Sequence, residues 1–308
     1  MSLLIVTLLT FALLAAAGGD VLATMSGDSR VSERALQEMR RTYELDRPLP
    51  IRYVRWLTRV VSGDMGESFY YHAPVVDLII PRLFNTTLLG FLALFIAWTI
   101  ALTLGTIAAS RAGSWIDRLC ELVILISAST PRLVLALIAL ALFARASLFA
   151  PGSHSSTGPS IVQLFIGAFT ISVPFIALFL AQVREGVGAA LQEDFVKLAR
   201  AKGLGERDVV IRHALRSTLN PLITIGGYSL GAVMSGSVIV EAVLGLSGLG
   251  SMSVNAVQSR DVPLLLGVVL ITAIAVFVGN IIADVLMYIN DPRLRTASIE
   301  QTQSRQKI

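Results

Sequence analysis

The chain has 308 residues, of which 54% are hydrophobic and 15% are charged, and its mean hydropathy is +0.72. This composition excludes an ordinary soluble enzyme and predicts several membrane crossings. The formal net charge is only +4, and the basic residues lie in loops without interleaved aromatic residues, so nucleic-acid binding has no support.

Six apolar segments are the predicted transmembrane helices. A helix rises about 1.5 Å per residue, so about 20 apolar residues cross a hydrocarbon core of about 30 Å. Five segments have this length and a shorter one precedes them, at residues 3–18, 83–110, 121–145, 161–183, 217–240 and 262–283. The sequence therefore predicts an all-α polytopic membrane protein with six transmembrane helices.

The first apolar segment, within residues 1–19, is interpreted as a transmembrane helix rather than a cleaved signal peptide. No basic flank accompanies its apolar run, and Gly18-Gly19-Asp20 after it offers no small-x-small cleavage site. We therefore expect this helix to be retained.

Residues 20–82 are predicted to form a helical subdomain outside the cell membrane. They hold nine arginines against nine acidic residues, and a segment of about 60 residues is translocated largely regardless of its charge. Helical spacing indicates one helix over residues 32–45 and a second that begins at Pro50. Residues 63–66, Gly-Asp-Met-Gly, are predicted to form the turn that ends the second helix.

The second of these helices has two predicted faces. We expect the inward face to consist of Tyr53, Val54, Leu57 and Val61. The opposite face carries Arg52, Arg55 and Arg59. This arginine face is either solvated, which is the simpler interpretation, or a docking surface for lipid headgroups or an acidic partner.

Basic residues set the predicted orientation in the membrane. They cluster at residues 111–118, between Arg184 and Arg216, and in the tail from residue 293 onward. Because short cytoplasmic loops carry an excess of Lys and Arg, all three clusters belong on the cytoplasmic side. Both termini are then inside, and residues 293–308 form a cytoplasmic tail.

The most distinctive inside segment covers residues 194–216. Seven of the chain's 25 basic residues lie between Arg184 and Arg216, and the uncharged runs on both sides are long enough to cross a bilayer. A charged hairpin between two crossings is suited to bind a soluble partner protein.

Signatures of catalysis and of metal binding are absent from the sequence. It contains no GxxxxGKS/T nucleotide-binding loop and no pair of carboxylates within a predicted crossing. The histidines His72, His154 and His213 fall in separate loops without cysteine or acidic ligands nearby, so no metal or catalytic site is expected. The single cysteine, Cys120, can form no intramolecular disulfide and is expected to be a buried apolar residue.

The predicted crossing at residues 217–240 is rich in small residues. They are Gly226, Gly227, Gly231, Ser235, Gly236 and Ser237. The spacing from Gly227 to Gly231 is a small-xxx-small pattern, which lets membrane helices approach closely. The pattern fits internal packing and equally fits a helix at a subunit interface that lines a passage.

Arg132 lies within a predicted crossing, and Glu241 and Asp284 directly follow two others. Arg132 follows Pro131, and an arginine left at mid-membrane costs about 2.5 to 3.5 kcal/mol. Either Arg132 faces a water-filled passage, or its helix begins later and the side chain reaches the headgroups. Glu241 and Asp284 are predicted to close their crossings near the interfaces, where a carboxylate is tolerated, so they are not expected to form an ion relay.

Residues 241–261 are too short and too polar to span the membrane. Their apolar residues and the sequence Gly248-Leu249-Gly250 fit a segment that dips back against the membrane, where a passage would meet the outside. A plain connecting loop is the alternative.

Several short motifs follow one another in an order that resembles a known family. They are residues 63–69 (Gly-Asp-Met-Gly-Glu-Ser-Phe), 113–118 (Gly-Ser-Trp-Ile-Asp-Arg), 199–204 (Ala-Arg-Ala-Lys-Gly-Leu), 212–216 (Arg-His-Ala-Leu-Arg), 240–241 (Val-Glu), 248–250 (Gly-Leu-Gly), 260–263 (Arg-Asp-Val-Pro) and 291–293 (Asp-Pro-Arg). Over residues 13–293 the chain resembles the inner-membrane permease subunits of the dipeptide, oligopeptide and nickel family of ABC importers.

This resemblance implies the type I ABC importer permease fold, with a five-helix core at residues 83–292. It makes residues 190–216 a cytoplasmic coupling loop of the EAA type, whose short helix inserts into a cleft of the ATPase subunit. The implied coupling residues are Ala199, Arg200, Ala201, Lys202, Gly203, Leu204 and Gly205. The chain departs from the motif at Lys197 and Leu198, where glutamate and alanine are expected, and Pro221 comes later than usual.

Two further groups of residues gain expected roles from the resemblance. The translocation path or its helix packing would involve Gly227, Gly231, Ser235, Gly236 and Arg132. An external gate or a contact with the binding protein would involve Gly248, Leu249 and Gly250. Before this second group, Leu246-Ser247 replaces the tryptophan-proline pair often found in the family.

The resemblance also implies partners and a location. The partners would be a second homologous permease in a heterodimer, two ABC ATPase subunits that bind ATP and Mg²⁺, an extracytoplasmic substrate-binding protein, and the lipids of a bacterial inner (plasma) membrane. This chain would catalyse no reaction and would hold no cofactor.

The implied cargo is a dipeptide or oligopeptide, with nickel chelates or haem as alternatives. A secondary transporter driven by an ion gradient is the rival function, but it needs ionisable residues deep within several crossings, and Arg132 is the one such residue in the sequence. An intramembrane protease would need a serine with a histidine, or paired aspartates, inside the crossings, and these are absent.

Overall fold

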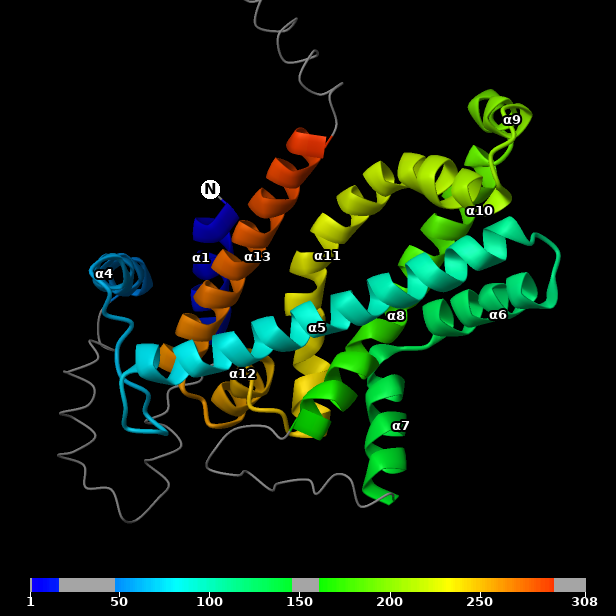
Figure 1. The fold of residues 1–308 in the computed structure, drawn as a ribbon. Helices are drawn as coiled ribbons and strands as arrows, with labels where there is room; N and C mark the ends of the chain where they lie inside the picture. The colour runs from blue at the N-terminus through cyan, green and yellow to red at the C-terminus, as the bar shows by residue number, and fades with distance from the viewer. Residues whose placement is uncertain (1, 17–47, 146–160, 291–308) are drawn as a thin grey trace, which may run out of the picture. The chain divides into compact units, whose positions relative to one another are not determined.

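The computed structural model describes residues 2–16, 48–145 and 161–290. These residues form helices joined by short connections, and within them there is no β-strand, only an isolated bridge between Glu67 and Pro74 (Figure 1). The all-α prediction is therefore confirmed. The predicted helix at residues 32–45 and the predicted tail at residues 293–308 lie outside the described residues, as do residues 151–160.

Four helices are long and apolar enough to cross a membrane. They are α5 (Val75–Ser110), α8 (Ile161–Ala190), α11 (Leu215–Leu244), which continues a helical run from Glu206, and α13 (Val262–Asn290). Each contains one of the predicted crossings. Each is also longer than predicted, because the helix continues past the apolar run; α5, for example, begins before Asp77 and contains Pro81.

The predicted crossing at residues 121–145 is not one helix, and that prediction was wrong. Helix α6 (Trp115–Ser129) and helix α7 (Arg132–Arg145) meet at an angle of 105°. Thr130, between them, is extended at φ −92° and ψ 121°. The cause is Pro131, which disfavours helical geometry in the residue before it and has no N–H to donate. Taken together, the bent pair is the fifth candidate crossing.

The first predicted crossing corresponds to α1 (Ser2–Ala16), which has 15 residues. At about 1.5 Å per residue the described helix is about 22 Å long, which is shorter than a hydrocarbon core of about 30 Å. The described part of the chain therefore contains up to five crossings by length and composition, with α1 as the shorter sixth helix of the sequence prediction.

The chain forms two compact units, and α5 and α13 each contribute to both. Unit 1 consists of Met1–Thr87 with Ser247–Ala275, and unit 2 of Leu88–Leu246 with Val276–Ile308. Unit 1 includes α1, α4 (Leu49–Val61) and α12 (Leu249–Gln258). Unit 2 includes α6, α7, α8, the short helices α9 (Asp194–Ala201) and α10 (Glu206–Asp208), a π-helical turn (Val209–Ala214) and α11.

Helix α4 packs in unit 1 through an aromatic face. Tyr53 is buried, its ring meets Phe11 of α1 edge to face, and its hydroxyl forms a hydrogen bond of 2.9 Å with Thr7. The inward face predicted from the sequence was only partly correct, since Val54 is 57% and Val61 is 83% exposed. The buried arc is centred instead on Tyr53, Trp56 and Leu57, because these are the side chains that face α1 and α13. Arg55 and Arg59 lie on the exposed side.

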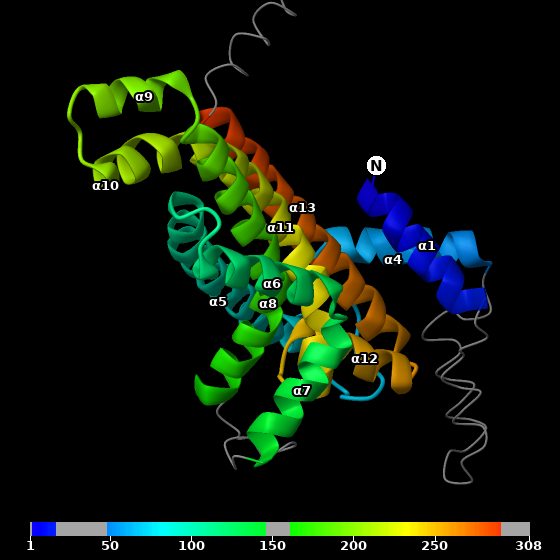
Figure 2. The same ribbon diagram turned by 90° about the vertical axis from the view of Figure 1, so that its right-hand side faces the viewer.

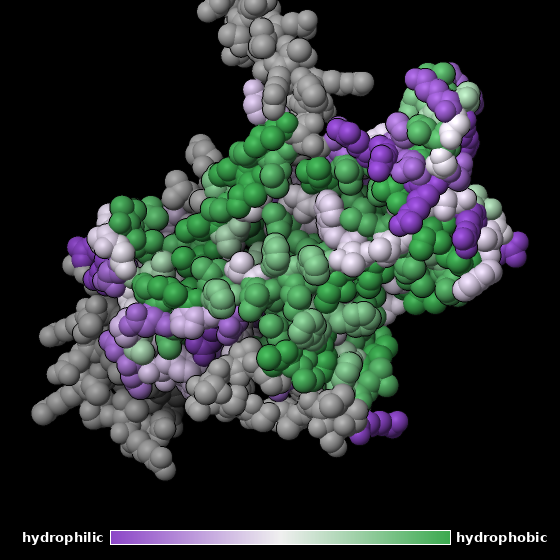
Figure 3. All heavy atoms as spheres, in the orientation of Figure 1, coloured by the Kyte–Doolittle hydropathy of each residue, from purple (hydrophilic) through white to green (hydrophobic). Residues whose placement is uncertain are grey.

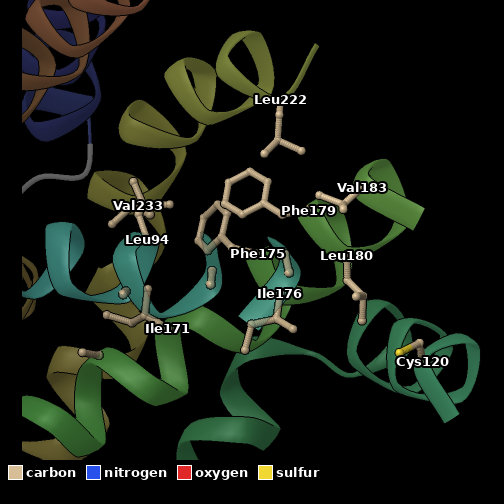
Figure 4. Packing of buried hydrophobic residues seen from close by; sticks show 14 of the residues in the cluster. Leu94, Cys120, Ile171, Phe175, Ile176, Phe179, Leu180, Val183, Leu222 and Val233 are labelled. Carbon is tan, nitrogen blue, oxygen red and sulfur yellow. The ribbon is translucent and has the colours of Figure 1, made fainter. Parts of the chain in front are cut away.

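The core of unit 2 is built around α8. Its residues Phe175, Phe179 and Leu180 are buried and pack among side chains of α5 and α11 such as Leu94 and Leu222 (Figure 4). Cys120 is buried in the same cluster, as predicted. These contacts hold the two helices that lead into and out of the charged hairpin.

Candidate functional site

The charged hairpin predicted at residues 194–216 consists of α9, a turn, α10 and the π-helical turn. It lies between the end of α8 and the start of α11, and α9 and α10 run side by side (Figure 2). Val196, Ala199 and Val209 are buried against one another and form a small core of its own. The hairpin is therefore a folded element rather than a loose loop.

Gly203 turns the chain at the tip of the hairpin. Its φ of +80° lies in the left-handed region, where a side chain costs about 1 to 2 kcal/mol. The Leu204 N–H donates to the Ala199 carbonyl at 3.3 Å and the Gly203 N–H donates to the Arg200 carbonyl at 2.9 Å. This is the Schellman arrangement that ends a helix with glycine. A Cβ built on Gly203 would meet no atom within 4 Å, so the backbone conformation, not space, favours glycine here.

The surface of the hairpin combines charge with exposed apolar side chains. Residues 200–208 are all exposed. Phe195 and Leu198 lie three residues apart on α9 and are 43% and 58% exposed, and Leu204 at the tip is 42% exposed. Hydrophilic residues dominate this end of the molecule in Figure 3, while hydrophobic residues cover the long helices. Exposed apolar side chains on a polar protrusion are typical of a surface that a protein partner covers.

Ion pairs fix the shape of the hairpin. Arg200 binds Glu206 with two hydrogen bonds, Nε to Oε2 at 3.1 Å and Nη2 to Oε1 at 2.5 Å, and so joins α9 to α10. The hydrogen bond with Glu206 raises the pKa of the Arg200 guanidinium above its ordinary value, so this bridge stays charged. Arg212 and Asp208 form a second pair at 3.2 Å.

The predicted coupling residues divide into two groups. Ala199 is buried in the hairpin core, so its small side chain serves the packing of α9 on the π-helical turn. The other members are exposed, from Arg200 to Gly205. His213 lies half-buried on the π-helical turn.

The small residues of α11 are sites of close helix packing within unit 2. A Cβ on Gly227 would collide with Ala283 of α13, and one on Gly231 would lie 3.1 Å from Val276 and 3.2 Å from Asn280. A Cβ on Gly236 would collide with the guanidinium of Arg132. Ser235, by contrast, is exposed.

Arg132 is the first residue of α7, immediately after the break, so its helix begins later than the predicted crossing, as one of the two sequence interpretations expected. Its guanidinium carbon lies 5.7 Å from the ring centroid of Phe175 on α8. The side chain is partly exposed. Phe175 was not singled out in the sequence, because a phenylalanine in an apolar run gives no sign of a cation nearby.

The predicted external residues Gly248, Leu249 and Gly250 begin α12 and are buried in unit 1. The Leu249 N–H donates to the Thr86 hydroxyl at 2.8 Å, and the Asn85 amide donates to the Ser247 carbonyl at 2.8 Å. Their local role is to seat α12 against α5. The segment at 241–261 is thus not a plain loop, since it contains the ten-residue helix α12.

Two buried carboxylates were not recognised in the sequence. Asp261 accepts hydrogen bonds from the Ser68 hydroxyl at 2.5 Å, the Tyr70 N–H at 3.1 Å and the Leu264 N–H at 3.2 Å. Glu241 was predicted near an interface but is fully buried, because α11 continues beyond it to Leu244. The motifs at 63–69 and 260–263 contain Ser68 and Asp261, but nothing in the sequence pairs residues 193 positions apart.

The motif at residues 113–118 forms the start of α6 and ties it to α8. The Ser114 side chain accepts from the Asp117 N–H, and Asp117 accepts from the Gly113 N–H at 2.9 Å. Asp117 also binds Arg184 of α8, with Nε to Oδ1 at 2.5 Å. Arg184, counted in the sequence only as a topology charge, is thus also a structural residue.

Among the described residues, no three His, Cys, Asp or Glu side chains converge on a metal site.

Comparison with known proteins gives full-length matches. The family model "Binding-protein-dependent transport system inner membrane component" matches residues 101–296, and the model of the N-terminal part of such components matches residues 1–90. The oligopeptide transport system permease protein AppB of Bacillus subtilis is 33% identical over 300 residues, 95% of each chain. A Brucella suis biovar 1 protein whose name assigns it to the peptide permeases is 32% identical over 302 residues, again 95% of each chain.

A solved structure has the same fold. It is described as a crystal structure of an amino acid ABC transporter with histidines, and it matches with a TM-score of 0.53 and 16% identity over 69% of this chain and 94% of that one. The chain therefore belongs to the family of binding-protein-dependent transport system inner membrane components, multi-pass inner-membrane permease subunits of ABC transporters that work with ATPase and substrate-binding partners.

Proposed function

We propose that this chain is the permease subunit of an ATP-driven importer that moves dipeptides or oligopeptides across the bacterial inner membrane by alternating access. The names of the relatives in Bacillus and Brucella, which match over 95% of the chain, support peptides as the cargo. Nothing in these matches favours nickel chelates or haem. The chain itself carries out no bond cleavage, and ATP and Mg²⁺ bind to the partner ATPases.

The hairpin at residues 194–216 docks on the ATPase from the cytoplasmic side in this proposal. The single observation that carries it is the exposed tip: a rigid, ion-paired turn that presents Leu198, Leu204 and Phe195 beside charged residues. Such a mixed surface suits insertion into a cleft of another protein. The docking role belongs to residues 200–205, and Ala199 supports them from within.

Motion of the ATPase is transmitted to the membrane helices because the hairpin is joined directly to the long helices α8 and α11. The end of α8 leads into α9, and the π-helical turn leads directly into α11 without an intervening loop. A rigid hairpin that tilts would therefore tilt both long helices. The close contacts of Gly227 and Gly231 with α13 leave little side-chain bulk between the helices that must shift.

The assembly has two permeases, two ATPases and an external binding protein. We propose that the second permease is a different, homologous chain, that both termini of this chain are cytoplasmic and that residues 20–82 lie outside. Gly248, Leu249 and Gly250 position α12 on the outer side, where the binding protein delivers its cargo.

Gly203 is the residue at which the coupling role is tested. In a Gly203→Val variant the left-handed backbone becomes unfavourable, so the tip must refold and the hairpin no longer fits its cleft. Peptide uptake and the stimulation of ATP hydrolysis by loaded binding protein are both expected to be lost, while the protein remains inserted and assembled.

The control is Gly203→Asn, because asparagine tolerates the left-handed conformation better than other side chains, and the space around the site is open. This variant is expected to keep most of the uptake. Normal uptake by Gly203→Val in reconstituted vesicles would contradict the coupling role.

A further inference from the structure

Arg132 lies where three helices of unit 2 meet. It is the first residue of α7, its guanidinium packs directly on the Cα of Gly236 in α11, and it stands over the ring of Phe175 in α8, 5.7 Å from the centroid. Both α8 and α11 are candidate membrane crossings. The charge is therefore built into the membrane-embedded part of the protein rather than into a solvated loop.

Among residues 2–16, 48–145 and 161–290, none forms an ion pair or a hydrogen bond with the Arg132 guanidinium, which contacts Phe175 and Gly236. Holding the charge of an arginine at mid-membrane costs about 2.5 to 3.5 kcal/mol. A cation that is held there without a carboxylate of the described residues as its partner indicates a transiently bound anionic ligand.

The packing leaves the donor groups of Arg132 available. Phe175 stabilises the guanidinium by a cation–π contact, which uses no carboxylate or carbonyl acceptor. Gly236 contributes no side chain, so it forms a notch for the Nη1 end of the guanidinium, while Nη2 lies farther from it. The side chain is also partly exposed, which lets a ligand approach. A planar fork of N–H donors held in one orientation matches a carboxylate.

We propose that Arg132 binds the C-terminal carboxylate of the peptide during its passage through the membrane. This inference rests on the proposed function, since it assumes that peptides are the cargo. Every unmodified peptide has that carboxylate whatever its sequence, so one fixed guanidinium would serve a carrier of varied peptides. Its strength would be limited, because the contact must break at release, and the cation–π contact with Phe175 stabilises the charge between transport cycles.

The proposal is tested with the complete complex, including its ATPases and binding protein, in liposomes that contain anionic lipid. Uptake of a labelled dipeptide is compared with uptake of the same dipeptide carrying a C-terminal amide, each at a concentration shown separately to saturate the binding protein. The variants are R132Q and R132K. R145Q is the matched control, because it removes the same charge from the exposed far end of α7.

Wild-type complex is expected to prefer the free dipeptide over the amide by about tenfold or more, as a charge-assisted contact provides. R132Q should slow uptake of the free dipeptide, leave that of the amide nearly unchanged, and so bring the ratio close to one. R132K should give an intermediate ratio, and R145Q the wild-type ratio. An unchanged ratio in R132Q overturns the proposal.

A second measurement does not depend on variants that must fold or on the binding protein. Phenylglyoxal modifies accessible arginines, and its reaction with Arg132 in the purified wild-type complex can be followed by mass spectrometry. Free dipeptide is expected to slow this reaction while the amide does not, and equal protection by both overturns the proposal.

A lipid phosphate is the other anion that could reach Arg132. In that case the loss of uptake in R132Q would disappear in liposomes without anionic lipid, and the ratio of dipeptide to amide uptake would not change; this result also overturns the proposal. A wild-type complex that imports neither compound would instead contradict the peptide-import function itself.

Discussion

At the scale of single residues, the backbone of α11 lies directly against α13 at Gly227. The nearest atoms to a Cβ built there are the Cβ of Ala283 and its backbone Cα, the latter at 3.0 Å. A flexible side chain could move aside, but a helix backbone cannot do so without separating the two helices. The glycine is therefore required by the close approach of the two helices.

The variant Gly227→Ala is expected to lower the free energy of unfolding by about 1 to 3 kcal/mol through overpacking. Gly188→Ala in α8 is the control, since no atom lies within 4 Å of its added Cβ. That substitution should be neutral or stabilise the helix by up to about 1 kcal/mol. Thermal unfolding of the two purified variants checks this, and equal shifts would show that Gly227 is not a packing residue.

Glycines are also the residues at which the sequence was most informative. A left-handed turn at Gly203 and close packing at Gly227 both follow from the absence of a side chain, which is visible in the sequence. Gly236 was grouped with Arg132 from the resemblance, but Phe175 was not, because a phenylalanine is an ordinary member of an apolar helix. Contacts of that kind depend on how α7, α8 and α11 pack in three dimensions.

At the scale of helices and turns, hydropathy predicted α5, α8, α11 and α13 but merged α6 with α7. A hydropathy average over about 20 residues does not register the single residue Pro131. The restriction that a proline places on the residue before it, here Thr130, was nevertheless a reason to expect a break in the helix. Buried links between distant elements had no local signal. The Asp261 carboxylate joins the turn after α4 to the start of α13 through donors that lie far apart in the chain.

The variant Asp261→Asn tests that link. One amide oxygen cannot accept from Ser68 and Tyr70 on one side and from Leu264 on the other, and the new NH₂ group would face a donor. Because the site is buried, unit 1 should lose about 1.5 to 3 kcal/mol of stability.

The control is Asp64→Asn, since the exposed Asp64 accepts only from the Gly66 N–H at 2.8 Å and an amide oxygen can replace it. This variant should change stability by no more than about 0.5 kcal/mol. Limited proteolysis at residues 63–71, together with thermal unfolding, measures both. An Asp261→Asn protein as resistant as Asp64→Asn would refute the link.

At the scale of the whole molecule, composition and helix length were enough to predict a polytopic membrane protein, and motif order was enough to predict the permease family. The hairpin unites these two conclusions, since it is the charged, folded element between two crossings. A rival mechanism driven by an ion gradient would need ionisable groups within several crossings. Our account instead places the energy source in a partner that must touch residues 200–205.

The most direct test of this account is a photochemical cross-link from the tip of the hairpin. Native Cys120 is buried, so a Leu204→Cys variant offers a single accessible thiol for a maleimide-benzophenone reagent. After irradiation of the assembled complex, the account predicts a covalent product between this chain and the ATPase, and none from the control Tyr70→Cys, whose position is 64% exposed in unit 1. A thiol at position 204 that reacts with an impermeant reagent on intact cells and forms no product with the ATPase would contradict it.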